Sequence, residues 1–534
     1  MLAGASVLVV TATASQASPI PRLVQAPAVR GGAPISARDR VYTADQSSNT
    51  VTVINPATNR VLGTIPLGAE RLGPLLGPQY VGDIDVHGMG FSPDGRYLDV
   101  ISVTTNTVTV IRTATNKVVS QTYVDRASHE GMFSPDGKTV WVASRGTNLV
   151  DVVDPIRGNV IDRIPTADGP SKVVFSPNGR YAYVNHIRAA VNDVIDVKSR
   201  RVVRTIKGLA SDFSSDEMIS PDGQELWAAH KKTGQVSIID LRTNTVAGVL
   251  NTGADTNHPN FVTHGQTDFA YLTVGSLNQT LVFQRSGNQI RHPKLVARVP
   301  DSGVQPHGLW PSADNTRLYV VNEKSDVVDV VDTATNKVIE SIPNGQESQA
   351  LVYVADAVPT GPGTSGLTRQ GLDKKVVNTD IKSGAGKAQL TVRQLEGLDM
   401  IQVEASGLTP KTNYTLYGQK DGTATKLLSF TTNAKGKESQ ALGFTYFFGV
   451  YDPATTLLQP SSHATAPTAA TTTTGPTGTG STAVPTHVNA GTGGQAAQVS
   501  SSTIARDSEL AALAVGLLVA GSAGTRIMRR RATR

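Results

Sequence analysis

Alternating apolar and polar residues recur at a nearly constant interval over the first two thirds of the chain. The stretch 106–118 reads as an alternating strand, a tight turn and a second strand, and near copies occupy 49–61 and 326–338. The Asn or Gly that ends each turn supplies the positive φ that a short hairpin loop needs. A hairpin repeated in this way indicates a repeat architecture.

A second motif fixes the phase of the repeat. Ser-Pro-Asp/Asn-Gly follows an apolar residue at 91–95, 133–137, 175–179 and 219–223, and 261–265 is a degenerate copy. The first residues of these motifs are 42, 42, 44 and 42 positions apart. Proline fixes φ at the second turn position and Asp-Gly closes the turn, so each motif joins two strands.

One period therefore predicts four strands, which in one copy are 129–133, 139–143, 149–153 and 160–164. Four strands in about 42 residues are typical of one blade of a β-propeller. Complete copies begin near His87, His129, Ser171, Ser215, Asn257 and His307. The first copy, at Arg40, opens one strand late, and 349–355 is left over at the end. We expect this strand to complete the first blade, which closes a ring of seven and removes exposed sheet edges.

After the repeat, a Pro/Gly/Ser-rich stretch (359–366) precedes a second alternating region. Strands are expected at 388–392, 400–405, 413–418, 426–431 and 440–447. Residues 407–417 resemble the segment that leads to the tyrosine corner of fibronectin-type sandwiches. The predicted fold class is all-β: a seven-bladed propeller, a small Ig-like β-sandwich, and a disordered stalk with a C-terminal apolar helix.

Both ends of the chain carry possible export signals. The run 1–17 is apolar and ends in Ala-Thr-Ala and Ser-Gln-Ala, which fits a secretory signal peptide, although a basic start is missing and a disordered apolar tail is the alternative. The run 510–524 is apolar and arginines follow it. This run is shorter than the roughly 20 residues of a free-standing membrane helix.

The tail as a whole resembles the sorting tails of bacterial wall-anchored proteins, without their Leu-Pro-x-Thr-Gly motif. We therefore expect an exported protein held at the cell surface by its C-terminus, through the membrane or the wall. The predicted segments are 1–30 (signal peptide and flexible N-terminus), 40–358 (propeller), 359–379 (linker), 380–455 (sandwich), 456–506 (disordered spacer) and 507–534 (transmembrane or sorting-signal-like anchor).

Composition narrows the chemistry. The chain has no cysteine, which excludes disulfides, thiolate metal sites and cysteine nucleophiles. The net charge is +6, but five arginines among the last nine residues account for all but one unit of it. A nucleic-acid partner is not expected, because it requires a basic face on the folded part.

The repeat also resembles a known family. Val320-Val-Asn322 together with 332–345 is similar to the repeat of the YVTN family of seven-bladed propellers, and the likeness extends over 40–358. The resemblance implies a fold like that of microbial surface-layer propellers and, more distantly, of nitrous oxide reductase and lactonase propellers. It implies little about function, because propellers host unrelated activities.

Several polar residues share one position of the repeat. His87, His129 and His307 each lie 11 residues before an apolar residue of the next strand, and His258 lies at or beside the same position. This position starts the innermost strand, at one mouth of the central channel. The candidate ligand-binding residues of this funnel are His87, His129, Glu130, Lys172, Glu217, His258 and His307.

Two interpretations of the funnel are open. In the functional one, the residues bind a ligand or a metal, and several imidazoles suit copper or zinc. The histidine motifs of nitrous oxide reductase are not reproduced, so its activity does not carry over. In the structural one, which we favour, the histidines bond to a neighbouring blade and recur because the repeat was duplicated. No cofactor is therefore expected, with copper or zinc as the alternative.

No catalytic residue is assigned. A lactonase-like site could use Asp85, Asp216, Glu217 and Arg188, which are candidates by position only. The sequence has no Gly-x-Ser-x-Gly, His-Glu-x-x-His or phosphate-loop motif. His186, His230 and His292 are expected to be exposed, and Trp141, Trp227 and Trp310 to pack between blades. Asp151, Asp154, Asp329 and Asp332 are expected on solvated strand faces.

These observations favour a binding or scaffold protein with a monomeric propeller and an unidentified protein or carbohydrate ligand at the cell surface. The alternative is a propeller enzyme, either a lactonase-like hydrolase or a metal-dependent oxidoreductase that uses the funnel. A third possibility is a structural surface-layer component, which predicts ordered self-association.

Overall fold

The computed structural model describes residues 32–68, 86–285, 292–395, 399–420, 423–445 and 456–461. The predicted signal peptide, the predicted anchor, Asp85 and most of the predicted spacer lie outside these residues. The described chain is almost entirely β, with one short 3-10 turn at Gly275–Leu277. Among the described residues, no helix has the length and apolar character needed to span a bilayer.

Between Arg40 and Val354 the described strands form seven antiparallel sheets of four strands each. From inner to outer strand, the first four sheets are β28 (Ser348–Val354), β1 (Arg40–Asp45), β2 (Thr50–Asn55) and β3 (Arg60–Pro66); β4 (Val86–Phe91), β5 (Tyr97–Ser102), β6 (Thr107–Arg112) and β7 (Lys117–Tyr123); β8 (Ser128–Phe133), β9 (Val140–Ser144), β10 (Leu149–Asp154) and β11 (Asn159–Pro165); and β12 (Pro170–Phe175), β13 (Tyr181–His186), β14 (Val191–Asp196) and β15 (Arg201–Lys207). The remaining three are β16 (Asp216–Ile219), β17 (Glu225–His230), β18 (Gln235–Asp240) and β19 (Thr245–Asn251); β20 (Thr256–His264), β21 (Thr267–Val274), β22 (Gln279–Gln284) and β23 (Lys294–Pro300); and β24 (Pro306–Pro311), β25 (Arg317–Asn322), β26 (Val327–Asp332) and β27 (Lys337–Pro343).

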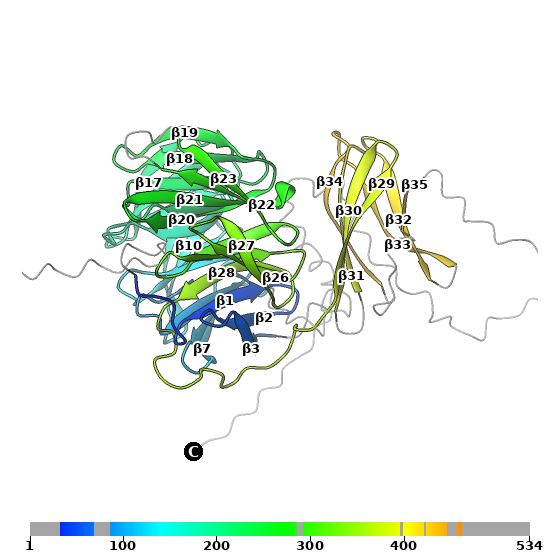
Figure 1. The fold of residues 1–534 in the computed structure, drawn as a ribbon. Coiled ribbons are helices and arrows are strands. Elements are labelled where there is room, and N and C mark those ends of the chain that lie inside the picture. Colours follow the sequence, from blue (N-terminus) through cyan, green and yellow to red (C-terminus); the bar gives the residue numbers. More distant parts are fainter. Residues whose placement is uncertain are drawn as a thin grey trace, which may run out of the picture.

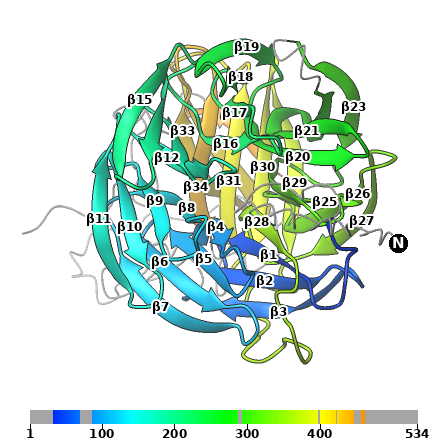
Figure 2. The ribbon, with the colours of Figure 1, turned by 90° about the vertical axis from the view of Figure 1, so that its left-hand side faces the viewer.

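The sheets stand around one axis. The first strand of each sheet contacts the first strands of both neighbours, and β28 contacts β4 as well as β24. Figure 2 shows the fourth strands, such as β15, β19 and β27, around the perimeter and β4, β8 and β28 near the middle. The ring closes where β28 pairs with β1, as predicted for the leftover strand 349–355. This arrangement is that of a β-propeller.

The turn residues explain the hairpins. Asn59, Asn116 and Asn336, which end the Thr-Asn turns, have φ of 51°, 55° and 56°. Asparagine tolerates this left-handed region because its short side chain bonds locally. In the Ser-Pro-Asp-Gly turn at Ser92, the serine hydroxyl donates to Asp94 Oδ1 at 2.6 Å and Gly95 takes φ of 70°.

Aromatic contacts between blades anchor the core. Trp141 on β9 packs edge-on against Phe175 of the next sheet at 5.2 Å between ring centroids. Trp227 meets Phe261 in the same way at 5.8 Å. These contacts explain why Trp141 and Trp227 are essentially unexposed. The tryptophans pack between blades, as expected from the sequence.

The expectation of solvated acids on the third strands is wrong for two of them. Asp151 and Asp329 have no exposed surface, because the connection from the preceding blade covers them. The backbone N–H of Asp125 donates to Asp151 Oδ2 at 3.0 Å, and that of Ser302 donates to Asp329 Oδ2 at 2.7 Å. These carboxylates therefore join neighbouring blades, because they satisfy backbone groups that would otherwise be buried without partners.

The segment predicted as a linker lies along the propeller. Thr368 and Thr64 form an isolated bridge, Arg40 donates to the Pro362 carbonyl at 2.6 Å, and Asn116 donates to the Gly363 carbonyl at 2.9 Å. The first strand of the second domain begins at Val376, four residues before the predicted boundary.

The second domain has two sheets over one apolar core. The four-stranded sheet contains β29 (Val376–Ser383), β30 (Gly386–Gln394), β31 (Asp399–Ser406) and β34 (Glu438–Thr445), and the three-stranded sheet contains β33 (Thr423–Thr431), β32 (Asn413–Lys420) and β35 (Leu457–Pro460). β35 lies inside the segment predicted as a disordered spacer, and it is ordered because it pairs with β32. Tyr414 OH accepts from the Thr409 N–H five residues upstream at 3.1 Å. Figure 1 shows this domain beside the ring.

Candidate functional site

A β-bulge begins six of the seven innermost strands. In β8, Ser128 pairs with Ser144 but Gly131 pairs with Val142, so β8 carries one extra residue, and β4, β12, β20, β24 and β28 show the same shift. A bulge breaks strict side-chain alternation. The neighbours His129 and Glu130 consequently both reach His87, with donor atoms of all three within 4.8 Å of one another.

The first position of the bulge carries the predicted histidines. His87 Nε2 and His129 Nε2 are 2.8 Å apart, and the His87 and His307 ring centroids are 6.5 Å apart. His129 Nδ1 lies 3.0 Å from the Ser171 carbonyl, and His307 Nδ1 lies 2.6 Å from the Gln349 carbonyl. Each of these bonds reaches the next blade, 42 residues along the chain. The structure therefore brings His87, His129 and His307 together at the channel.

The next residue of each inner strand contributes to a polar arc. Glu130, Lys172, Asp216 and His258 occupy it in four successive blades. Lys172 Nζ is 2.6 Å from Asp216 Oδ2, and His258 Nδ1 is 3.4 Å from the same oxygen. Gly88 stands at this position in another blade, where a Cβ would lie 2.2 Å from the His129 carbonyl oxygen. A side chain larger than that of glycine would therefore collide with the neighbouring strand at this position.

Two sequence-based assignments at this site need correction. Glu217 does not face the channel: it points between blades, where its Oε2 accepts from Asn192 Nδ2 at 2.5 Å. Asp216 takes the channel position because consecutive residues of β16 alternate sides. Arg188 does not join the funnel either, because its guanidinium pairs with Asp168 at 2.8 Å.

Two histidines expected to be exposed are buried. His186 has no exposed surface, and its Nε2 lies 3.5 Å from Asp193 Oδ2. His230 is also fully buried, with Nε2 2.8 Å from Ser237 Oγ. Both lie on second strands, which neighbouring strands cover on both sides. His292 is exposed, as expected.

Burial dominates the electrostatics of the channel. Burial raises the pKa of Glu130 to about 8, against the opposing attraction of Lys172. Burial also raises the pKa of Asp216 to about 6, although Lys172 favours its ionised form. The pKa values of His129 and His258 fall well below the ordinary value, first because burial disfavours the charged ring. At neutral pH the His129 and His258 rings are therefore neutral, and Asp216 and Lys172 form an ion pair beside them.

Sequence reasoning missed two buried polar groups next to this arc. Asp99 is fully buried, and burial raises its pKa to about 7. A Cβ on Gly131 would lie 2.9 Å from Asp99 Oδ2, so the carboxyl packs against the strand that carries Glu130. Arg145 donates to Ser171 Oγ at 2.6 Å. Neither stands in a motif, and only the register between blades would have indicated them.

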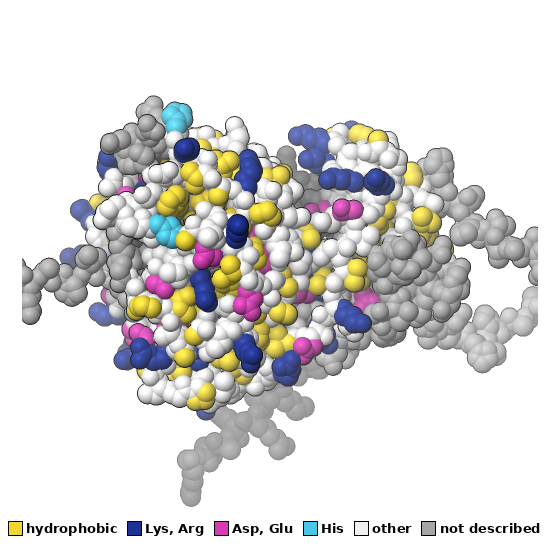
Figure 3. Space-filling view, viewed as in Figure 1, with side chains coloured by type: hydrophobic (Ala, Val, Ile, Leu, Met, Phe, Trp, Pro, Cys, Tyr) yellow, Lys and Arg dark blue, Asp and Glu magenta, His cyan; other side chains and the backbone are white. Residues whose placement is uncertain are grey.

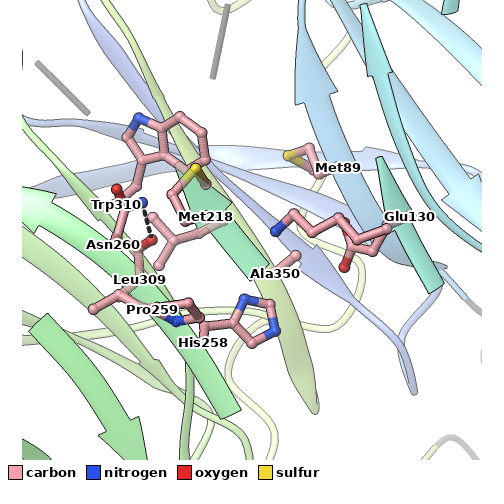
Figure 4. Close-up of a pocket in the computed structure, with 11 residues that line it drawn as sticks. Met89, Glu130, Met218, His258, Pro259, Asn260, Leu309, Trp310 and Ala350 are labelled. Carbon is pink, nitrogen blue, oxygen red and sulfur yellow. Dashed lines mark hydrogen bonds between the residues drawn. The ribbon is translucent and has the colours of Figure 1, made fainter. Parts of the chain in front are cut away.

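A small cavity adjoins the arc. The volume open to the centre of a water-sized sphere is about 10 Å³, which leaves room for about one water molecule. Figure 4 shows Trp310 and Met218 on one side of it, Met89 and Glu130 on the other, and His258 below them. Pockets for organic ligands usually measure about 300–1,000 Å³. The channel geometry therefore suits a water molecule or an ion rather than an organic substrate.

The second domain sits at the same mouth of the channel. Arg393 on β30 is fully buried and donates to Asp326 Oδ1 at 2.9 Å and to the Glu323 carbonyl at 2.8 Å. Gln402 donates to Glu347 Oε1 at 2.6 Å. Glu323 Oε2 lies 4.0 Å from His307 Nε2, so the interdomain contact reaches the histidine ring.

Comparison with known proteins assigns neither a family nor a function to this chain. No family model matches the sequence, and no curated protein matches it. Among solved structures, the chain is similar to Kuenenia stuttgartiensis hydrazine synthase, with 21% identity, a TM-score of 0.44, and 49% of this chain and 87% of that chain covered. It is also similar to a functionally unknown protein from Desulfotomaculum acetoxidans, with 14% identity, a TM-score of 0.49, and 58% and 98% covered. Neither similarity enters the functional argument.

Proposed function

We propose that this chain is an exported cell-surface binding and scaffold protein, built as a seven-bladed propeller of the YVTN type and an Ig-like sandwich on a flexible stalk. The hydrogen bond from the Thr409 N–H to Tyr414 OH supports the Ig-like assignment, because a tyrosine hydroxyl bonded a few residues upstream is typical of such domains. The apolar segments near both termini support export and anchoring.

The observation that carries the proposal is the locked contact between the two domains. Arg393, Asp326 and Glu347 are buried where the sandwich meets the propeller, so the sandwich takes one orientation on one face of the ring. The opposite face, with the Ser-Pro-Asp-Gly turns, then points away from the sandwich. A rigid pair of domains with a loop-rich open face suits the presentation of a binding surface.

The open side carries a groove that suits a saccharide or a peptide. This groove measures about 610 Å³, and Asn178, Tyr181, Asp222 and Asn244 are among its lining residues. Amide and carboxylate groups beside an aromatic ring offer hydrogen bonds and a stacking surface. On the face drawn in Figure 3, basic and acidic side chains are interspersed, which does not favour a polyanion there.

The test is a binding screen of the purified full-length chain against arrayed bacterial and host polysaccharides and matrix proteins. We expect saturable binding without turnover of the bound molecule, weakened at least tenfold by Tyr181→Ala. The exposed Tyr123→Ala serves as the matched control and should bind normally. If Tyr181→Ala leaves binding unchanged, the groove is not the binding site.

The second candidate is a propeller enzyme, either a lactonase-like hydrolase or a metal-dependent oxidoreductase. The convergence of His87, His129 and Glu130 donor atoms within 4.8 Å favours it. Hydrolysis of small lactones or metal-dependent redox turnover, lost in His129→Gln, would establish this function in place of the first.

A further inference from the structure

The hydrogen bonds of two channel histidines fix where their protons lie. A backbone carbonyl can only accept, so His129 Nδ1, 3.0 Å from the Ser171 carbonyl, must carry a hydrogen. His87 Nδ1 lies 3.2 Å from Gln46 Oε1, and in this orientation of the amide the oxygen accepts a hydrogen carried by Nδ1. In neutral rings with these tautomers, both Nε2 atoms present lone pairs.

These two lone pairs face each other. His87 Nε2 and His129 Nε2 are 2.8 Å apart, a distance at which two acceptors repel unless a positive charge lies between or beside them. A proton would make one ring an imidazolium. Both rings are at most 9% exposed, and a charged ring without a counter-ion is costly in such a buried place.

The remaining features of the pair are those of a metal site. Histidine ligands usually donate their second ring N–H to a carbonyl or carboxylate, as these two do. Glu130 adds a carboxylate oxygen within 4.8 Å of a ring nitrogen of each histidine. All three side chains are at most 9% exposed and lie on the inner strands β4 and β8, which hold them in place.

We propose that His87 and His129, through Nε2, and Glu130, through its carboxylate, bind one divalent transition-metal ion at the mouth of the propeller channel. Imidazole and carboxylate ligands together suit Cu²⁺ or Zn²⁺. With metal–nitrogen distances of about 2.0–2.1 Å, two nitrogens 2.8 Å apart subtend close to a right angle. That angle matches neighbouring ligands of tetragonal Cu²⁺ better than tetrahedral Zn²⁺.

A second group of donors, Glu130, Asp216 and His258, also converges within 4.8 Å. Lys172 Nζ already lies 2.6 Å from Asp216 Oδ2, so a cation occupies that side. The lysine therefore directs the metal to the His87–His129 side. This inference holds whether the protein is a scaffold or an enzyme, so it does not rest on the proposed function.

The experiment uses the full-length chain without a histidine tag, stripped with chelator and dialysed against Cu²⁺ or Zn²⁺ in separate arms. Metal content is measured by mass spectrometry, and the Cu²⁺ arm also by electron paramagnetic resonance. We expect one ion per chain, a copper spectrum with nitrogen hyperfine structure, and a higher melting temperature of the metal-loaded protein.

Variants assign the ligands. His87→Gln and His129→Gln should each weaken binding at least tenfold, and Gln46→Leu, which removes the acceptor behind His87, should weaken it about tenfold. The exposed His292→Ala is the matched control and should bind as the parent does. Melting curves of the metal-free variants show which of them fold. Only the metal binding of the folded variants is compared with that of the parent. Binding below one ion per chain, or equal binding by folded His129→Gln, would overturn the site.

Discussion

Arg393 of the sandwich and Asp326 of the propeller form a buried ion pair, with 2.9 Å between Nη2 and Oδ1. Arg393 has no exposed surface and Asp326 is 7% exposed, so the pair is shielded from water and salt. Glu347 lies 4.0 Å from the same guanidinium. The contact therefore fixes the sandwich on the face of the ring that carries the histidines.

Replacing Arg393 by alanine should destabilise the protein by about 3–5 kcal/mol, because it leaves buried carboxylates without their cation. Urea denaturation followed by circular dichroism measures the change. The double variant Arg393→Ala, Asp326→Ala should recover part of the loss. Arg369→Ala removes a pair that is 72% exposed on both sides and should cost less than about 1 kcal/mol. If Arg393→Ala is as stable as this control, the buried ion pair does not hold the two domains together.

Asp45 should make stability depend on pH. Burial raises its pKa from 3.8 to about 6, although hydroxyls of Ser348, Thr43, Thr52 and Thr50 donate to it. The folded state then binds more protons than the unfolded state between these two values, so stability falls as pH rises through that window. The fall attributable to Asp45 is roughly 3 kcal/mol.

The measurement is the melting temperature of the parent and of Asp45→Asn at several pH values from 4 to 7. Asparagine cannot ionise, so the variant should lose less stability over this range than the parent. Identical slopes for the two proteins would show that Asp45 ionises in the folded state as it does in the unfolded chain.

Trp227 should be the costliest of the tryptophans to remove. It has no exposed surface, packs on Phe261 and Phe283 at 5.8 and 5.9 Å, and donates to Glu225 Oε2 at 2.9 Å. Trp227→Ala should lower the free energy of unfolding by about 3–5 kcal/mol. Tyr123→Ala, at a side chain that is 79% exposed, should change it by about 0.5 kcal/mol or less. Chemical denaturation of both variants provides the comparison.

Removing Lys172 should destabilise the protein, because a buried carboxylate then lacks its cation. Lys172→Met removes the cation 2.6 Å from Asp216 and beside Glu130, and should destabilise the protein by about 3–5 kcal/mol. Adding Asp216→Leu should restore much of the loss, since no buried charge then stays unpaired. If the double variant loses as much free energy of unfolding as the two single variants together, Lys172 and Asp216 are not coupled.

The repeat could be predicted from the sequence because local chemistry sets it. Asparagine and glycine at fixed turn positions, with alternating strands between them, define four strands per period, and the leftover strand 349–355 identifies the closing pair. The shared position of His87, His129 and His307 follows from the same spacing. These features need no knowledge of what covers each strand.

The site's details depend on packing between distant segments. Residue spacing shows that Asp216 and Glu217 take opposite sides of their strand but not which side faces the channel, so the place of Asp216 rather than Glu217 could not be predicted. Alternation places Asp151 and Asp329 on one face but does not show that the next connection covers them. Arg393 meets Asp326 67 residues away, across two domains, and no local pattern links them.

The propeller and the sandwich should behave as one rigid body in solution. The chain has no cysteine, so Lys198→Cys on the propeller and Lys435→Cys on the sandwich can carry two spin labels without background. Double electron–electron resonance should give one narrow distribution of the distance between the two labels. Arg393→Ala should broaden this distribution, and Arg369→Ala should leave it unchanged. A broad distribution in the parent, unaffected by Arg393→Ala, would contradict the claim.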